Sequence, residues 1–421
     1  MRAGFAAGAD RRVVVSGVGA VSGLGWGIEP LWQGLASGRS AIRPFQRFDH
    51  SAHRTHLAAE VPAPPFELER RFPGRQQTLA GRFALAAVDE ALAEAGLCVP
   101  RDVAEAAVFF SSSTGGMWES EAFLADVLAG RRQRLHAMAA QQLNCPGDAI
   151  ARHLGASGAV QTISSACASG ALALGAALRA VRSGAAELAI AGGSDSLCQL
   201  TYAGFNALRA VDEAPCRPFR AGRAGMSIGE GAAALVLEPL ERALARGAVP
   251  LAELAGAGAS CDAHHMTAPE PSGAGAATAI EAALSDAGVP PEAIDFINSH
   301  GTGTPLNDLA EWRALERVFG ERARRIPLTA TKAALGHLLG CSGAIEALVT
   351  VLCLQRGELH PVPGPDDGDA AGAALDSEVP VALVVGRPLA LPEARAALSA
   401  SLAFGGSNAA LVFLRWEAAG A

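Results

Sequence analysis

Short runs of apolar residues alternate along this chain with longer stretches rich in alanine and leucine. The first run covers residues 13–18, and similar runs follow at residues 107–110, 188–191, 233–237, 296–298, 381–385 and 411–414. Each run has the length of a buried strand, whereas residues 83–95 and 170–181 have the length of helices. This alternation predicts an α/β protein. Residues 361–380, rich in Pro, Gly and Asp, are expected to form a surface loop.

One combination of turn and helix occurs twice. A Ser-Gly-Ala step begins a helical stretch at Gly170 and again at Gly343, and glycines end the two stretches at Gly184 and Gly357. The same number of residues separates the two starting glycines and the two final glycines. This faint repeat favours two similar halves, each built from βαβ units, with a division inside the stretch 256–260.

Composition and charge narrow the class of protein. Half of the 421 residues are hydrophobic and 18% are charged, which is typical of a packed globular chain. The formal charge of −8 argues against binding to nucleic acid or to a membrane surface. We find no run of about 18 apolar residues and no secretory signal. The eight cysteines form no CxxC pair, so we expect neither zinc nor disulfides, and a cytoplasmic location.

The basic residues are almost all arginine. Of the 34 Lys and Arg residues, only Lys332 is a lysine. Arginine can replace lysine on a solvated surface, but not where a compact ammonium group is required. Lys332 is therefore a candidate for a specific role, with a solvated surface lysine as the alternative.

Cys167 lies between a short strand-like stretch and a helix of small and apolar residues. At the N-terminus of a helix, the positive end of the helix dipole favours the thiolate form of a cysteine. A strand-to-helix turn can also direct backbone N–H groups at an incoming carbonyl oxygen. This motif alone supports a nucleophilic Cys167 and a buried structural Cys167 about equally.

A histidine lies in a loop rich in glycine and threonine, just after a short strand. The segment reads Asn298-Ser-His300-Gly-Thr302-Gly-Thr304. It places an imidazole and two hydroxyl groups at the C-terminal edge of a sheet, which is where ligands bind in α/β proteins. The alternative is a turn whose polar side chains satisfy the backbone.

A second loop histidine, His337, follows Lys332 and precedes a helix. That helix carries Glu346 on an otherwise apolar face. Because a buried carboxylate is costly when it is unpaired, Lys332 is a candidate partner for Glu346. A structural His337 is the alternative to a functional one.

One cysteine and two histidines on separate loops favour nucleophilic acyl-transfer chemistry. The chain has no GxSxG sequence, which argues against a serine hydrolase. It also lacks GxxxxGK[ST] and the Rossmann glycine spacing, which argues against a phosphate-binding loop.

Six motifs occur in the order found in the β-ketoacyl-acyl-carrier-protein synthases, which are elongating, decarboxylating condensing enzymes. They are SSACASG, CRPF with GEGAA, HHMTAPEPSG, NSHGTGTPLND, TKAALGHLLGCSGAIEA and FGGSNAAL. The chain resembles this family over nearly its whole length. The resemblance implies an α/β thiolase-like fold with five layers, α-β-α-β-α, and two ketosynthase halves, residues 1–257 and 258–421. It also implies acyl transfer to a cysteine, followed by decarboxylative Claisen condensation with a malonyl-carrier thioester, in fatty-acid, polyketide or polyene synthesis.

The resemblance assigns roles to single residues. Cys167 would be the acyl-accepting nucleophile, and His300 and His337 would assist decarboxylation and stabilise the enolate. Lys332 and Glu346 would hold this network in place. The backbone N–H groups of Cys167 and Phe404 would form an oxyanion hole, and the side chain of Phe404 would act as a gate. Thr302 and Thr304 would form hydrogen bonds with the phosphopantetheine arm. Phe205 and Leu402 would contact the substrate. No metal or other resident cofactor is implied, because the phosphopantetheine arrives on the carrier protein.

Some positions depart from the fatty-acid enzymes of this family. Thr114 stands where those enzymes have an apolar or glycine pocket residue, and Cys341 stands where alanine is usual. Leu402 and Ala403, just before Phe404, are less common there. A polar residue at position 114 would suit an unsaturated or aromatic chain, as in polyene pigment pathways.

The resemblance implies an acidic acyl carrier protein as partner, together with a homodimer or a heterodimer. A chain with a charge of −8 must meet an acidic partner through a local basic patch, for which the candidates are Arg70, Arg71, Arg75 and Arg209. Solvated surface arginines are the alternative.

Two other functions are alternatives to that of a condensing enzyme. A non-catalytic chain-length partner would lack the nucleophile, whereas this chain has Cys167, His300 and His337. A degradative thiolase would need a second reactive cysteine near the C-terminus, and SASLAFGGSN contains none.

Overall fold

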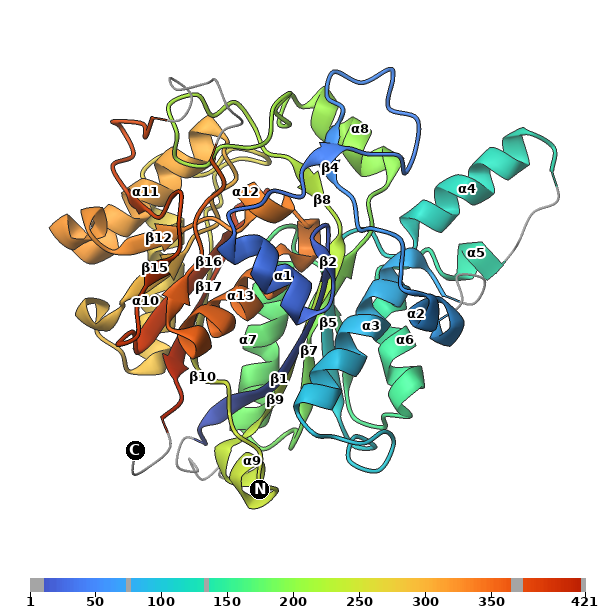
Figure 1. Ribbon diagram of the computed structural model, residues 1–421, viewed down its shortest axis with the longest axis horizontal. Helices are drawn as coiled ribbons and strands as arrows, with labels where there is room; N and C mark the ends of the chain where they lie inside the picture. Colours follow the sequence, from blue (N-terminus) through green and yellow to red (C-terminus); the bar gives the residue numbers. More distant parts are fainter. Residues whose placement is uncertain (1–10, 73–76, 132–135, 365–373, 418–421) are drawn as a thin grey trace, which may run out of the picture.

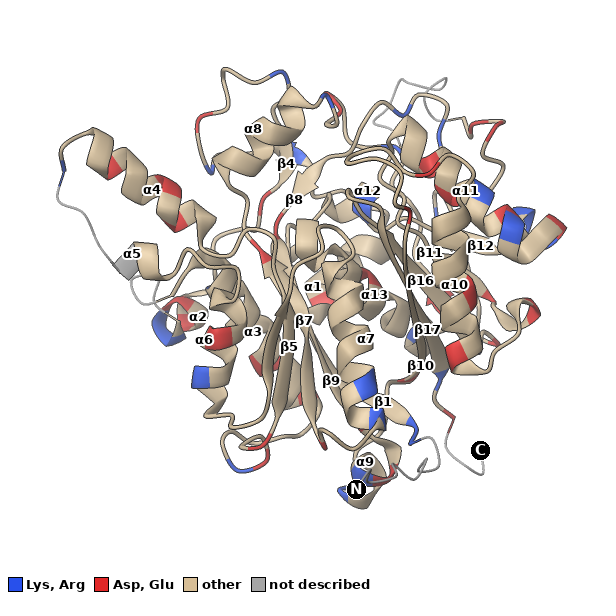
Figure 2. Ribbon diagram, turned by 180° about the vertical axis from the view of Figure 1, so that it is seen from behind, with Lys and Arg blue, Asp and Glu red and all other residues tan. Residues whose placement is uncertain are grey.

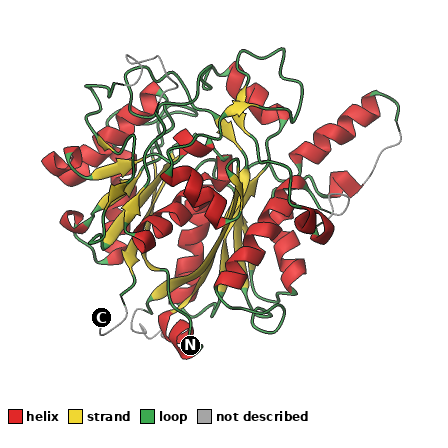
Figure 3. Cartoon of the chain, viewed as in Figure 1, coloured by secondary structure: helices red, strands yellow, loops and turns green. Residues whose placement is uncertain are grey.

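The computed structural model describes residues 11–72, 77–131, 136–364 and 374–417. Within these residues, one continuous sheet consists of two half-sheets, which lie on either side of two central helices (Figure 1 and Figure 3). The N-terminal half-sheet has the strand order β1-β9-β7-β5-β6. Its strands are β1 (Val13–Ser22), β5 (Ala107–Ser111), β6 (Val160–Ile163), β7 (Ala189–Asp195) and β9 (Gly231–Pro239).

The C-terminal half-sheet repeats this topology, with the order β10-β17-β16-β11-β12-β14. Read outward from the centre, both orders run through the first strand of the half-sheet, its last strand, the strand before that, and then two earlier strands, and the C-terminal half-sheet adds β14 at its edge. Val14 of β1 pairs with Glu253 of β10, so an antiparallel contact joins the two half-sheets. The strands are β10 (Ala252–Cys261), β11 (Phe296–Asn298), β12 (Pro327–Thr329), β14 (Ala382–Leu383), β16 (Ala396–Leu402) and β17 (Ser407–Arg415).

Helices complete five layers, α-β-α-β-α (Figure 1). The central layer consists of α7 (Ser169–Arg182) and α13 (Ser342–Arg356), which lie between the half-sheets. The outer layers contain α3 (Leu79–Glu94) and α6 (Cys145–Leu154) on one side, and α10 (Ala274–Ala287) and α11 (Pro305–Phe319) on the other. This is the thiolase-like arrangement that the sequence predicted.

The two central helices contact each other at the glycines of the sequence repeat. A Cβ atom at Gly170 would lie 2.4 Å from the backbone nitrogen of Ala344, and one at Gly343 would lie 2.6 Å from that of Ala171. Both distances are shorter than any ordinary contact, so no side chain fits at either position. The faint repeat therefore reflects a helix contact to which both halves contribute.

Helix α13 is buried on all sides and mostly apolar, because it lies between the two half-sheets. Every residue from Ser342 to Leu354 is buried. Among the described residues, the stretch Leu339–Arg356 is the one helical segment long and apolar enough to cross a membrane, and 89% of it is buried inside the protein. A helix in the middle of a core has to be apolar over most of its surface.

Shorter elements connect and cover the layers. The helices are α1 (Ile28–Ala36), α2 (Phe66–Arg71), α4 (Met117–Leu128), α5 (His136–Ala139), α8 (Gln199–Ala207), α9 (Leu240–Ala245) and α12 (Lys332–Leu335), with 3-10 turns η1 (Pro291–Ala293), η2 (Gly320–Arg324) and η3 (Leu339–Cys341). The small strands are β2 (Gly25–Trp26), β3 (Arg43–Pro44), β4 (Leu57–Ala59), β8 (Ile228–Gly229), β13 (Glu358–Leu359) and β15 (Leu389–Ala390). Charged residues lie mostly on the outer helices and loops (Figure 2).

Each predicted strand and helix has a counterpart, and most of these are longer than predicted. The run at 233–237 is the middle of β9, whereas the run at 381–385 yields only the two residues of β14. Within the predicted loop at 361–380, residues 365–373 lie outside the described part of the chain. The predicted division between residues 257 and 258 falls inside β10, and the division itself stays a prediction.

Candidate active site

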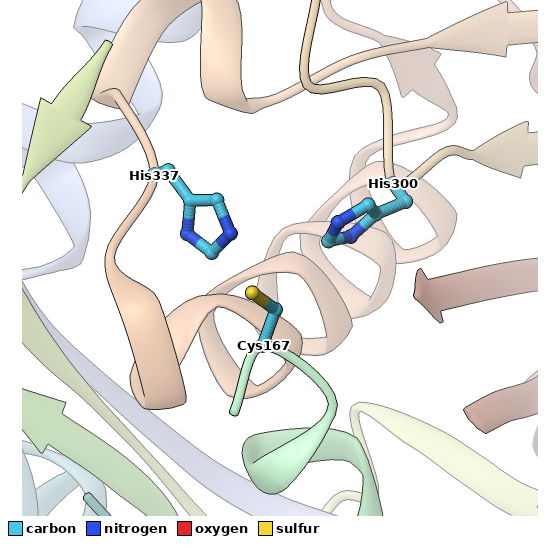
Figure 4. Close-up of side chains that lie close together, drawn as sticks. All are labelled: Cys167, His300 and His337. Carbon is cyan, nitrogen blue, oxygen red and sulfur yellow. The ribbon is translucent and has the colours of Figure 1, made fainter. Parts of the chain in front are cut away.

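Cys167, His300 and His337 come from three loops and meet in one place (Figure 4). Cys167 lies in the turn between β6 and α7, His300 follows β11, and His337 follows α12. The Cys167 sulfur and one ring nitrogen of each histidine lie within 4.8 Å of one another, and all three residues are buried. A group of this composition could chelate a soft metal ion, and it could equally surround a reacting thioester.

The side chain of His337 is held so that one nitrogen stays free. Its Nδ1 accepts a hydrogen bond from the backbone N–H of Leu339 at 2.9 Å and lies 2.9 Å from the hydroxyl of Ser342. A neutral imidazole that accepts at Nδ1 carries its hydrogen on Nε2. Nε2 of His337 is buried and has no hydrogen-bond partner among the described residues. It is therefore a donor available to a substrate oxygen.

His300 is oriented by Lys332. The Lys332 ammonium group lies 3.0 Å from His300 Nδ1 and donates to the His300 carbonyl oxygen at 2.7 Å. An ammonium group only donates, so Nδ1 accepts and the ring hydrogen again lies on Nε2. Burial, assisted by the charge of Lys332, lowers the pKa of His300 and of His337 well below the usual range. Both histidines are thus neutral N–H donors.

Lys332 and Glu346 form a buried ion pair, which confirms the pairing predicted from the sequence. Nζ of Lys332 donates to Oε1 of Glu346, and the two side chains are 2% and 1% exposed. Burial raises the pKa of Glu346 to about 7, while the charge of Lys332 opposes this rise. Lys332 is therefore a buried cation between His300 and Glu346, and the alternative of a solvated surface lysine is wrong.

The thiol of Cys167 is neutral in the free protein, which corrects the thiolate expected from the helix dipole. Burial raises the pKa of Cys167 to about 11, although the charge of Lys332 and the N–H groups of Phe404 and Cys167 lower it. The free-energy cost of removing the thiolate from water is larger than its stabilisation by the helix N-terminus and the ammonium group. The N–H groups of Phe404 and Cys167 thus lie near the sulfur, and their role as an oxyanion hole stays a prediction.

This raised pKa predicts how Cys167 reacts with an alkylating reagent. Only the thiolate reacts, so its fraction and the alkylation rate should rise about tenfold per pH unit below the pKa. We expect a log-linear rise between about pH 7 and about pH 10, measured as iodoacetamide labelling of the Cys167 peptide by mass spectrometry. A plateau near about pH 8 would contradict a pKa of about 11.

A cavity of about 290 Å³ is lined by Cys167 and both histidines, and by four residues predicted to bind substrate, Phe205, Thr302, Thr304 and Leu402. Phe404, the predicted gate, lines it too. The hydroxyl groups of Thr302 and Thr304 lie 2.9 Å apart. The ring centroids of Phe205 and Phe404 lie 5.9 Å apart. The cavity therefore offers both aromatic surface and hydroxyl groups to a long flexible substrate.

Thr114 is not among the residues that line this cavity, and its assignment as an acyl-pocket residue stays a prediction. Its hydroxyl donates to Oδ1 of Asp195 at 2.8 Å, and the backbone N–H groups of Ser113 and Thr114 donate to the same oxygen. Thr114 and Asp195 are both fully buried. Because a buried carboxylate must be hydrogen-bonded, the polarity at position 114 serves Asp195.

Replacing Thr114 by valine is expected to lower the free energy of unfolding by about 1–3 kcal/mol, since the buried Asp195 loses a donor. The preference between saturated and polyenoyl substrates should stay unchanged. Denaturant unfolding and a competition assay measure the two effects. A changed substrate preference with unchanged stability would show that Thr114 acts as an acyl-pocket residue.

The structure describes three of the four arginines predicted to contact a carrier protein, and these three do not all belong to one element. Arg209 is exposed, lines the cavity and has no ion pair among the described residues. Arg70 pairs with Glu67 and Arg71 with Asp89, and both arginines belong to α2, whereas Arg209 follows α8 in the chain. Arg75 lies outside the described residues. Within the described chain, only Arg209 of this set borders the site.

Glu311 is a site residue that was not predicted from the sequence. Its carboxylate accepts hydrogen bonds from the backbone N–H groups of His300 at 2.6 Å and Gly301 at 2.9 Å, so it fixes the loop that carries His300. Burial raises the pKa of Glu311 to about 7. One indication of this buried carboxylate was present in the sequence, because Glu311 stands between two apolar residues, Ala310 and Trp312. In the structure all three are buried in α11.

Comparisons with known proteins agree with this site. Residues 10–243 match the family described as Beta-ketoacyl synthase, N-terminal domain, and residues 251–364 match Beta-ketoacyl synthase, C-terminal domain. The chain is 34% identical to 3-oxoacyl-[acyl-carrier-protein] synthase 2 of Staphylococcus aureus (strain COL), over 97% of this chain and 99% of that protein. It is 37% identical to the protein of the same name from Synechocystis sp., with the same coverage of both chains.

Solved structures show the same fold. A chain of the ishigamide ketosynthase/chain length factor superimposes with a TM-score of 0.89 and 36% identity, over 97% of this chain and 100% of that one. A chain from a type II polyketide ketosynthase in complex with its acyl-carrier protein gives a TM-score of 0.87 and 28% identity, with the same coverage. With its motifs, its layered halves and its Cys-His-His site in agreement, the chain belongs to the β-ketoacyl synthase family.

Proposed function

We propose that this chain is an active condensing enzyme, in which Cys167 accepts an acyl group and His300 and His337 promote decarboxylation of a malonyl thioester. The observation that carries the proposal is the position of two neutral imidazoles beside the Cys167 sulfur, with their Nε2–H groups left over for substrate. The thiol of Cys167 would carry the acyl group, and the two imidazoles would donate hydrogen bonds to the malonyl thioester.

In the first step, the Cys167 sulfur attacks the carbonyl carbon of an acyl thioester. The N–H groups of Cys167 and Phe404 donate hydrogen bonds to the carbonyl oxygen and stabilise the negative charge that develops on it. The bond to the carrier sulfur then breaks, and the proton lost by the Cys167 thiol balances the proton gained by the departing pantetheine thiol. The product is an acyl group on Cys167.

In the second step, a malonyl thioester loses CO₂ and leaves an enolate. The Nε2–H groups of His300 and His337 donate to the thioester oxygen as it becomes negative. The enolate carbon attacks the acyl carbonyl on Cys167, and the Cys167 sulfur leaves as a thiolate that takes up a proton. Neutral histidines are suited to this task, since they donate hydrogen bonds without surrendering a proton to the enolate carbon.

The carrier protein is the expected partner, and its phosphopantetheine arm fits the part of the cavity that contains Thr302 and Thr304. We infer that the protein needs no resident cofactor and acts in the cytoplasm as a homodimer or as a heterodimer with a chain-length partner. The acyl chain belongs to fatty-acid, polyketide or polyene synthesis. A purely non-catalytic partner subunit would have no use for the thiol, the two histidines and the buried Lys332 together.

The test follows both steps on the purified protein. Acyl-carrier thioester should add an acyl mass to the Cys167 peptide, and malonyl-carrier thioester should then release CO₂ and remove that mass as a 3-oxoacyl product. Absence of acylation at Cys167 together with absence of CO₂ release would favour the non-catalytic partner instead.

Arg209 is expected to contribute to carrier binding, because it is the predicted arginine at the cavity. Arg209→Glu should raise KM for carrier-bound substrate on the order of tenfold, with a weaker effect at high salt. The matched variants Arg70→Glu and Arg71→Glu should leave KM unchanged. Equal effects of all three substitutions, measured by steady-state kinetics, would argue for a continuous patch.

A further inference from the structure

Three groups of the proposed site come from three separate elements. His300 lies two residues after the end of β11, Lys332 begins α12, and Glu346 lies within α13. The Lys332 ammonium group must reach His300 and Glu346 at the same time, so these elements have to keep a fixed register. Loss of that register by about 1 Å would weaken catalysis by about 10²-fold.

The side chain of Asn298 lies where the three elements meet, and it is fully buried. Its Nδ2 donates to the carbonyl oxygen of Glu346 at 2.9 Å and to the hydroxyl of Thr350 at 3.3 Å. Its Oδ1 accepts from the hydroxyl of Thr331 at 3.1 Å. The Glu346 carbonyl can only accept, which fixes the orientation of the amide.

Asn298 and the residues that it contacts are close in the sequence to the groups of the site, or belong to them. Asn298 is two residues from His300, Thr331 immediately precedes Lys332, and the accepted carbonyl belongs to Glu346 itself. Thr350 donates to that same carbonyl at 2.8 Å, so its hydroxyl is free only to accept from Asn298. Both hydrogens of the amide nitrogen are therefore used, and the amide oxygen has its donor.

We propose that Asn298 is a positioning residue that sets Lys332 and Glu346 against His300. It touches no reacting atom, and it acts by holding β11, the start of α12 and α13 in one register. With that register intact, the Lys332 ammonium group keeps the Nε2–H tautomer of His300. The proposal rests on the proposed function only for its effect on turnover, since the tautomer exists without substrate.

The first experiment separates the two half-reactions. Asn298→Leu, which keeps the branched shape but replaces the amide by larger apolar methyl groups, should reduce CO₂ release from malonyl thioester by about 10²-fold. Acylation of Cys167 should change by less than about threefold, since neither N–H group of the oxyanion hole depends on Asn298. Thr329→Val is the matched control, because Thr329 is equally buried but donates to the His360 carbonyl. Parallel losses in both half-reactions would overturn the proposal.

A second variant gives a readout that general loosening of the fold would not produce. In Asn298→Asp, an ionised carboxylate would face the Glu346 carbonyl without a hydrogen, whereas the protonated acid can donate to it. Burial raises the pKa of such a carboxyl, so the acid form should be restored as the pH falls from about 8 to about 6. CO₂ release by Asn298→Asp should then rise relative to the parent, and a flat ratio would count against the proposal.

Histidine NMR separates failure of this proposal from failure of the proposed function. In ¹⁵N-histidine-labelled protein without substrate, His300 should show the Nε2–H tautomer, and Asn298→Leu should alter that signal while Thr329→Val leaves it unchanged. An unaltered His300 signal in Asn298→Leu would overturn the positioning role. Absence of CO₂ release by the parent protein would overturn the proposed function alone, because the spectrum reports on the register without turnover.

Discussion

Replacing Cys167 by alanine is expected to abolish chain elongation, with a loss on the order of 10⁴-fold or more in the rate of condensation. No other described cysteine lines the cavity, so none can take over the acyl group. CO₂ release from malonyl thioester should continue at a measurable rate, because the Nε2–H groups of His300 and His337 remain in place. Product analysis and CO₂ release, measured on the same preparation, test the two statements.

A control for this variant is Cys98→Ala, which removes an exposed thiol that does not line the cavity. It should elongate as the parent does. Elongation by Cys167→Ala at the parent rate would show that the acyl group is carried elsewhere. Loss of CO₂ release in step with elongation would show that decarboxylation requires the sulfur, contrary to the roles assigned here.

Replacing Lys332 by arginine is expected to reduce CO₂ release by about 10²-fold or more, although the charge is kept. One ammonium nitrogen with three hydrogens meets three acceptors, which are the Nδ1 atom and carbonyl oxygen of His300 and the carboxylate of Glu346. A guanidinium group spreads its donors over a plane and is larger, and the Lys332 side chain is only 2% exposed. Arginine therefore cannot make the three contacts from one point.

The Lys332→Arg variant separates the two half-reactions, because Cys167 acylation depends mainly on the two backbone N–H groups. Acylation should fall less than CO₂ release, and thermal unfolding should show a folded protein. Lys332→Ala is the harsher comparison, since it leaves Glu346 buried without its partner and should cost about 3–5 kcal/mol of stability. CO₂ release at the parent rate in Lys332→Arg would show that a compact ammonium is not needed.

Much of the fold follows from local pattern. The apolar runs predicted β1, β5, β7, β9 and β11 within a few residues, because strands buried on both faces are apolar throughout. Their extents were underestimated where alanine, glycine and serine continue a strand, as in β7 (Ala189–Asp195). The antiparallel contact between β1 and β10 could not be predicted, since no periodicity specifies which strands pair across the centre of the molecule.

The identity of the site residues was also accessible from the sequence. Cys167, His300, His337 and the lone Lys332 stand out because each is a chemically special residue in a setting of small or apolar neighbours. The hydrogen bond of Thr114 could not be predicted in the same way. The polarity of Thr114 was evident, but the partner that explains it, Asp195, lies on a different strand and is invisible to local pattern.

Residue types, periodicity and motif order were enough to predict the fold class, the family and the candidate site residues. The protonation states could not be predicted in this way, because they depend on the three-dimensional surroundings of each group. Burial outweighs the helix dipole and makes the Cys167 thiol neutral, while the contacts of Leu339 and Lys332 with the two histidines place both ring hydrogens on Nε2. Desolvation and hydrogen-bond direction depend on what surrounds a group in space, and for this site the surroundings come from both halves of the chain.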